Sequence, residues 1–302
     1  MRIKKNKFKL SNIYLDMKVL FIDINMHTKN LNALLKYDIT MINYRGTDLD
    51  KFDLSQFDVV YSPSQPIDIK KYPNTKFIFG PHFSVFPEQH QIDIISGNNA
   101  IYVQPSKWVM DVWMSNPICN RIRVDVLPFG VDTVKFSPSK SIVERNEVFI
   151  YYKTRHPNEF NLLYSFLKNK NLNPRIFSYD NKYPEQDFIN YSQQTKFAIW
   201  LGRHESQGFA LEETLACDIP LLVWNSTSMN QEYNLNYPDI PATTIPYWDD
   251  RCGEYFTDIQ ELPDVYNKFI SKLNDYKPRE FILEKLSMEK CEKIFIDIVK
   301  KI

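Results

Sequence analysis

The sequence predicts an α/β protein made of two doubly wound domains, each with a parallel sheet covered by helices on both faces. Three observations support this fold class. Short runs of continuous apolar residues recur along the 302 residues, and their lack of polar alternation is typical of strands buried on both faces. Polar loops and helix-like stretches separate these runs, as crossover connections require. The length exceeds one typical domain core and suits two.

Composition narrows the class of protein. Hydrophobic residues make up 43% and charged residues 25% of the chain, which indicates a folded protein. Lys plus Arg and Asp plus Glu both total 37, and this balance gives no support for a nucleic-acid partner. The four cysteines form no CxxC pair, which favours a reducing, cytoplasmic compartment over a zinc site or a disulfide framework. No apolar run approaches about 18 residues, so no membrane span is predicted.

The elements follow in order along the chain. Residues 1–16 are basic, and we expect a flexible extension there; peripheral contact with a membrane through these residues is the alternative to a solvated tail. The N-terminal, acceptor-side domain is expected over 17–138 and the C-terminal domain over 139–302, because Pro, Gly and Ser punctuate residues 128–140. The expected strands of the first domain are 18–24, 38–44, 57–62, 76–80, 100–105 and 123–130. Those of the second are 147–153, 174–179, 196–202, 219–224 and 242–248.

Two helical stretches end the chain. Apolar residues recur at spacings of three and four over 258–273 and 278–302. The second stretch carries one apolar stripe, formed by Leu283, Leu286, Ile294, Ile298 and Ile302. We expect this stripe to pack on a core, either of its own domain or of the first.

The stretch HESQGFALEE, residues 204–213, follows an apolar run at the point where a parallel strand ends. Ligands of parallel α/β domains bind at that edge of the sheet. We expect a helix to begin near Gly208, which leaves Glu205 in the preceding loop and Glu213 about one and a half turns into the helix. Both can then face one pocket. Glu212, as the direct neighbour of Glu213, must point elsewhere.

A simpler explanation exists for these carboxylates. Acidic residues in the first turns of a helix are favoured by its dipole alone, by about 0.3–1 kcal/mol each. The full pattern is more specific: a strand, Glu205, seven residues containing Gly208 and Phe209, Glu213, a small-residue helix and an apolar strand. It resembles the nucleotide-sugar site of GT-B glycosyltransferases with two glutamates spaced by seven residues, the retaining, group 1 or family 4-like enzymes.

Other segments extend the resemblance. FGVDTVKFSP, residues 129–138, is similar to the link between the two domains of that family. YYKTRHP, residues 151–157, follows the first strand of the second domain, where the family places basic residues on the donor diphosphate. The resemblance implies two Rossmann-like domains facing a cleft. One departure lies in DINMHTKNLNALL, residues 23–35, which has no glycine where the family has a glycine-rich loop.

The resemblance also implies roles for individual residues. Glu205 would hold hydroxyls of the donor sugar, Glu213 would hold the ribose, and His82 would lie near the reacting sugar, which makes His82 and Glu205 the candidate catalytic residues. Carboxylates suit hydroxyls because they accept several hydrogen bonds. The remaining candidate substrate-binding groups are the side chains of Lys153 and Arg155, for the diphosphate, and the backbone N–H groups of Gly208 and Phe209 at a helix start.

Each of these assignments has an alternative. Lys153 and Arg155, two apart at a strand end, should project in similar directions, either toward a diphosphate or simply into solvent. His82 is either near the sugar or satisfied within a turn. Because lysine, arginine and a helix end would supply the positive charge, we expect no metal and no cofactor.

The predicted function is a metal-independent, hexosyltransferase-like glycosyltransferase, with retention of configuration. Its partners would be a nucleotide-sugar donor and a glycan, lipid or protein acceptor. A nucleotide-sugar epimerase on the same fold is one alternative. A non-catalytic sugar-nucleotide-binding module is another, favoured by the missing glycine-rich loop.

Overall fold

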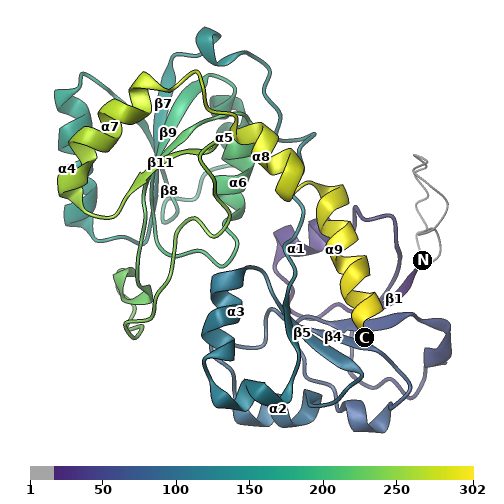
Figure 1. The fold of residues 1–302 in the computed structure, drawn as a ribbon. Coiled ribbons are helices and arrows are strands. Elements are labelled where there is room, and N and C mark those ends of the chain that lie inside the picture. The colour runs from purple at the N-terminus through teal and green to yellow at the C-terminus, as the bar shows by residue number, and fades with distance from the viewer. Residues whose placement is uncertain (1–16) are drawn as a thin grey trace.

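The computed structural model describes residues 17–302, which form two α/β domains built on two parallel sheets (Figure 1). This architecture confirms the predicted fold class. The expected basic extension at residues 1–16 lies outside the described residues.

The first sheet has six parallel strands in the order β2-β1-β3-β4-β5-β6. Every residue of β3, β4 and β5 is buried, as expected of strands covered on both faces. The strands are β1 (Lys18–Ile22), β2 (Thr40–Tyr44), β3 (Val59–Ser62), β4 (Phe77–Phe79), β5 (Ala100–Gln104) and β6 (Val124–Val126). The helices are α1 (Thr28–Leu34), α2 (Gln89–Ile95) and α3 (Lys107–Met114), with short 3₁₀-helices at Leu54–Gln56, Ile69–Lys71 and Pro117–Arg121.

The second sheet has five parallel strands in the order β11-β10-β9-β7-β8. These strands are β7 (Glu147–Lys153), β8 (Arg175–Ser178), β9 (Thr195–Gly202), β10 (Leu221–Trp224) and β11 (Gly253–Phe256). The helices are α4 (Pro157–Asn169), α5 (Glu185–Ser192), α6 (Phe209–Ala216) and α7 (Leu262–Ser271), with short 3₁₀-helices at Ile142–Glu144, Met229–Gln231 and Ile259–Glu261.

The fifth strand of this sheet is not where the sequence predicts it. Residues 242–248 form an irregular segment, because side chains bind its backbone: the Asn225 Oδ1 accepts from the Thr244 N–H at 2.8 Å, and the Thr243 hydroxyl accepts from the Ile245 N–H at 3.1 Å. The strand is β11 instead. Its first residue, Gly253, has φ +136°, and a Cβ there would lie 2.0 Å from the Leu221 carbonyl oxygen, so only glycine fits.

Both sheets share one strand order, in which the second strand lies beside the first and the third lies on its other side. The direction of winding therefore reverses between β1 and β3, and again between β7 and β9. Ligands of open α/β sheets bind at the carboxyl ends of the strands at such a switch point. Lys153 and Gly202, the last residues of β7 and β9, are partners in the ladder, so the loops that follow them start side by side.

The two last helices connect the domains. The helical conformation is interrupted between α8 (Pro278–Lys285) and α9 (Met288–Lys301), where the Val131 N–H donates to the Leu286 carbonyl at 2.9 Å. Helix α9 then lies along the first domain, beside α1 and β1 (Figure 1). Its Phe295 ring packs near the rings of Tyr37 and Tyr61. The sequence-based boundary grouped α9 with the second domain, whereas its packing joins it to the first.

Candidate active site

A cleft of about 940 Å³ lies between the domains, at the carboxyl ends of β1, β4 and β5 on one side and of β7, β8 and β9 on the other. Residues from both domains line it. Among them are the predicted site residues His82, Lys153, Glu205, Gly208, Phe209 and Glu213. Six of the seven residues predicted from the sequence therefore line one cavity. The seventh, Arg155, lies elsewhere.

The loop after β9 is shaped by Gly208. Helix α6 begins at Phe209, as expected, and Gly208 precedes it in the left-handed conformation, with φ +97°. A side chain is strained at this φ, which explains the glycine. The backbone of Glu205 is held from two sides: its N–H donates to the Thr243 carbonyl at 2.9 Å, and its carbonyl accepts from the Trp108 indole at 2.9 Å. Trp108 belongs to the first domain, so both domains position this loop.

Lys153 and Glu205 form an ion pair within the cleft. The Lys153 Nζ lies 2.7 Å from the Glu205 Oε1, and the two side chains are only 12% and 14% exposed. The pair follows from the switch point, since Lys153 ends β7 and Glu205 follows the end of β9. The Lys153 ammonium also lies 4.6 Å from the ring centre of Tyr179, which follows β8.

Glu213 is paired with a lysine that the sequence argument missed. The Lys29 Nζ, on α1 of the first domain, lies 2.5 Å from the Glu213 Oε1 and 2.5 Å from the Glu185 Oε1. Burial raises the pKa of Glu213 to about 7, against the opposing effect of Lys29. Burial lowers the pKa of Lys29, but Glu213 and Glu185 outweigh it and leave that pKa above its ordinary value.

A sequence signal for Lys29 did exist. Lys29 is the second residue of α1, in the glycine-free segment that follows the first strand of the first domain. The segments that follow the carboxyl ends of parallel strands line the ligand sites of α/β domains, so a cationic residue in this segment was a candidate. The contact itself joins residues 184 positions apart, which no local pattern reveals.

Glu212 lies on the other side of α6. Glu212 is fully buried, and its Oε2 accepts a hydrogen bond from the Gln207 Nε2 at 3.0 Å. The same Gln207 amide accepts from the Phe129 N–H at 2.9 Å and donates to the Phe129 carbonyl at 2.7 Å. Burial raises the pKa of Glu212 well above its usual range, which favours the neutral form of this carboxyl. Glu212 thus supports the link between the domains rather than the cleft.

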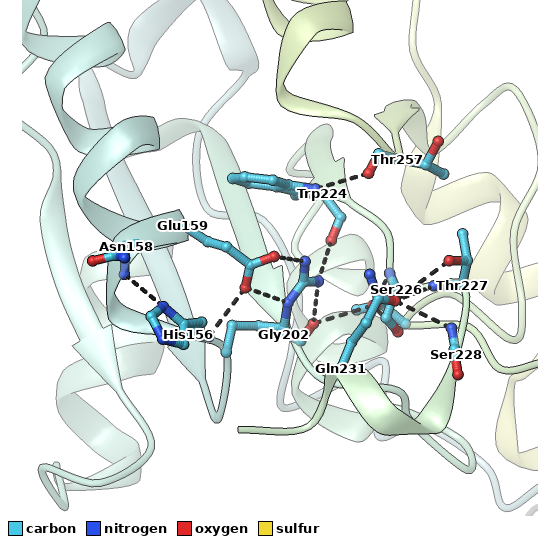
Figure 2. Close-up of polar contacts among 12 residues, drawn as sticks. His156, Asn158, Glu159, Gly202, Trp224, Ser226, Thr227, Ser228, Gln231 and Thr257 are labelled. Carbon is cyan, nitrogen blue, oxygen red and sulfur yellow. Dashed lines mark hydrogen bonds and ion pairs between the residues drawn. The ribbon is translucent and has the colours of Figure 1, made fainter. Parts of the chain in front are cut away.

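Arg155 does not reach the cleft, and the expectation that it projects like Lys153 is wrong. Strand β7 ends at Lys153, and Thr154 has φ +44°, so the alternation of an extended strand stops there. The Arg155 side chain is fully buried. Its guanidinium donates to both oxygens of Glu159 and, at 3.2 Å each, to the carbonyls of Gly202 and Trp224; Figure 2 shows these three partners. Arg155 therefore ties α4 to the sheet.

His82 lines the first-domain side of the cleft. The ring Nε2 of His82 lies 3.1 Å from the Asn30 Nδ2, and the backbone N–H of His82 donates to the Pro63 carbonyl at 2.8 Å. An amide nitrogen only donates, so the His82 Nε2 accepts and the ring proton is on Nδ1. Burial, together with His27, lowers the pKa of His82 to about 4, which leaves the imidazole neutral at neutral pH. The ring of His27 stacks on that of Phe209 across the cleft, at 6.2 Å.

Two other histidines, His204 and His156, follow the ends of β9 and β7. His204 lines the cleft between the rings of Trp108 and Tyr237, and burial lowers its pKa to about 4. Its Nδ1 is buried without a hydrogen-bond partner among the described residues. His156 instead caps α4, where it accepts from the Asn158 N–H at 3.1 Å (Figure 2).

Residues 17–302 contain neither a clustered metal site nor a membrane-spanning helix. No group of three or more His, Cys, Asp or Glu side chains in this range is arranged to hold a metal ion. None of the helices in the same range has the length and apolar character needed to cross a bilayer.

Solved structures of glycosyltransferases share this architecture. Sucrose-phosphate synthase from Thermosynechococcus elongatus superposes with a TM-score of 0.55 at 9% identity, over 94% of this chain and 98% of that one. The lipopolysaccharide outer core galactosyltransferase WaaB, in its apo form, gives 0.55 at 14% identity, over 95% and 100%. A scan against protein-family models and a search of curated proteins gave no match. These similarities show the GT-B fold: two Rossmann-like domains that face a cleft.

Proposed function

We propose that this protein is a glycosyltransferase that moves a hexose from a nucleotide-sugar donor to an acceptor, with retention of configuration. The proposal stands on one observation: Glu205 and Glu213 both line the interdomain cleft at a switch point, and each lies within 2.7 Å of a lysine. Carboxylates recognise adjacent hydroxyls, and lysines recognise phosphates. A nucleotide sugar carries both kinds of group.

The donor fits the second-domain side of the cleft. Glu213 would accept hydrogen bonds from the ribose, and Glu205 from the donor sugar. Lys153 and the start of α6 would hold the diphosphate, since free N–H groups and the helix dipole favour an anion there. When the bond to the sugar breaks, negative charge grows on the departing diphosphate. Fixed positive charges stabilise that charge without a metal ion.

The acceptor would then approach from the first domain. His82 lies on that side, and its neutral ring leaves the Nδ1–H as a donor. We propose that it binds a hydroxyl near the reacting sugar. A pKa of about 4 makes it a poor base at neutral pH, so its role is to position the sugar rather than to remove a proton.

A screen of nucleotide sugars tests the proposal. The protein would be melted with UDP-, GDP- and ADP-linked hexoses; a ligand at a hundred times its Kd stabilises the fold by about 2.7 kcal/mol. The stabilising donor would then be incubated alone and with glycan, lipid and peptide acceptors. Transfer, or slow release of the nucleoside diphosphate, supports a glycosyltransferase. Interconversion of the donor sugar without an acceptor indicates an epimerase, and binding without turnover indicates a binding module. Failure of every nucleotide sugar to bind contradicts the proposal.

A further inference from the structure

We propose that Lys29 makes this cleft selective for ligands that carry a diphosphate, through an exchange of counter-ions. Without ligand, Lys29 neutralises Glu213 and Lys153 neutralises Glu205. An incoming diphosphate binds both lysines in place of the glutamates, which leaves both carboxylates able to accept hydrogen bonds from hydroxyl groups. This inference rests on the proposed function, since it assigns the ribose and the sugar to these two carboxylates.

The position of Lys29 sets it apart from the other cations of the cleft. Four lysine and arginine side chains line the described part of the cleft: Lys29, Lys153, Lys182 and Arg203. Lys29 alone comes from the first domain, on α1, yet both of its carboxylate partners belong to the second. Its side chain is 31% exposed, whereas that of Glu213 is 8% exposed. A ligand in the cleft can therefore reach the ammonium, while the carboxylate stays covered by it.

The energetics favour an exchange over a simple addition. Glu213 is nearly buried, and taking the paired cation away from a buried carboxylate is strongly unfavourable. A nucleoside offers Glu213 only neutral hydroxyls and offers Lys29 no anion, so it must displace an ion pair with weaker contacts. A nucleoside diphosphate offers Lys29 a new anion at the same time. Lys29 then keeps an anionic partner while Glu213 accepts hydrogen bonds from the ribose, so binding of the diphosphate promotes binding of the ribose.

The same reasoning explains the glycine-free segment after β1. A glycine-rich loop would bring backbone N–H groups to the diphosphate, but such groups carry no charge with which to neutralise Glu213. Here the segment places the ammonium of Lys29 between Glu213 and Glu185. Because Lys29 and Glu213 belong to different domains, the diphosphate contacts both domains once it has taken Lys29.

Calorimetric titration of Lys29→Gln tests the exchange. The probes are UDP, GDP and ADP and the matching nucleosides uridine, guanosine and adenosine. In the wild type we expect one diphosphate to bind and its nucleoside to bind far more weakly. In Lys29→Gln, affinity for the diphosphate should fall about ten- to a hundredfold, as expected for loss of a charged hydrogen bond. Affinity for the nucleoside should stay the same or rise, so the preference for the diphosphate shrinks.

Two further variants serve as controls. Lys36→Gln removes a lysine that pairs with Asp132 and does not line the cleft, so it should keep the wild-type preference. Lys29→Arg keeps the positive charge and should retain most of the preference for the diphosphate over the nucleoside. If Lys29→Gln weakens the nucleoside and the diphosphate by the same factor, or changes neither, the exchange is wrong although the proposed function survives. If no probe binds the wild type, both are wrong.

Discussion

Glu212 and Glu213 are neighbours on α6, yet their carboxyl groups occupy opposite environments. Glu213 faces the cleft and pairs with Lys29, whereas Glu212 is fully buried against Gln207. Adjacent residues of a helix point about 100° apart, which places the two groups on different faces. One consequence is that a substitution at Glu212 is no neutral control for one at Glu213, because it disturbs the clamp that Gln207 makes on Phe129.

Glu212 should tolerate glutamine and reject alanine. Burial favours the neutral form of Glu212, and a neutral carboxyl has nearly the same shape and charge as a carboxamide. Glu212→Gln should therefore change the free energy of unfolding by less than about 1 kcal/mol. Glu212→Ala leaves a cavity and deprives the Gln207 amide of an acceptor, which should cost about 2–4 kcal/mol. Urea denaturation measures both. Equal damage from the two substitutions would mean that Glu212 is ionised in the folded protein.

Substitutions of Glu213 and Glu205 should affect different steps, nucleotide binding in the first case and turnover of the donor in the second. Glu213→Ala should weaken binding of the nucleoside diphosphate about ten- to a hundredfold, because its proposed partner is the ribose. Glu205→Ala should leave that binding nearly intact and lower turnover of the full donor by a similar factor. Titration calorimetry and initial rates separate the two. Glu280→Ala, at an exposed position on α8, is the matched control. The reverse assignment of effects would exchange the roles of the two glutamates.

The raised pKa of Glu213 predicts a pH-dependent stability. Its pKa is about 7 when folded and 4.5 ordinarily, so between these values the folded state binds more protons than the unfolded state. Stability from this group is therefore full below about pH 4.5 and is lost as the pH rises through 7. The unfolding free energy of the wild type minus that of Glu213→Gln should fall by on the order of 3 kcal/mol from pH 4.5 to 8, because only the wild type carries the titrating group. A difference that stays constant with pH would contradict the shift.

Arg155 and Lys153 should behave as opposites. Arg155→Ala removes the ion pair with Glu159 and the guanidinium donors to two buried carbonyls, and should lower the free energy of unfolding by about 3–5 kcal/mol. Lys153→Ala should cost little stability and should weaken diphosphate binding. Thermal melting and calorimetry on the folded protein give the two readouts. Normal stability combined with lost binding in Arg155→Ala would return Arg155 to the ligand site.

Chelation should not affect the reaction. Positive charge at the proposed diphosphate site comes from Lys153, Lys29 and the start of α6, so EDTA should leave the rate of transfer unchanged. The measurement is the initial rate after treatment with EDTA, with and without added magnesium or manganese. Strict dependence on either ion would show that these groups do not suffice.

The sequence predicts ten of the eleven strands of residues 17–302, because most are local runs of apolar residues and the central ones are buried throughout. The eleventh is the instructive exception. The apolar and β-branched residues at 242–248 suit a strand, but Thr243 and Asn225 bind the backbone instead. Strand β11 begins with Gly253 at the sheet edge, and its need for glycine comes from a neighbour, the Leu221 carbonyl, that no local pattern contains.

The candidate site divides in the same way. Glu205, Glu213 and Lys153 lie at strand ends or in the following helix, and the topology of a parallel sheet is enough to bring them together. Arg155 was misplaced because Thr154 leaves the extended conformation, a change that two residues of sequence do not show. Lys29 was missed because its partners lie in the other domain, and such a contact depends on how the domains face each other.

The return of α9 to the first domain has a consequence for synthesis of the protein. Strand β6 leaves the ribosome about 160 residues before α9 does, as judged from their positions at 124–126 and 288–301. Yet Phe295, Ile298 and Val299 of α9 belong to the same apolar core as Val19, Phe21 and Tyr61. The nascent first domain therefore emerges with part of one face of its sheet uncovered. It must wait for the whole second domain to be translated before that face is closed.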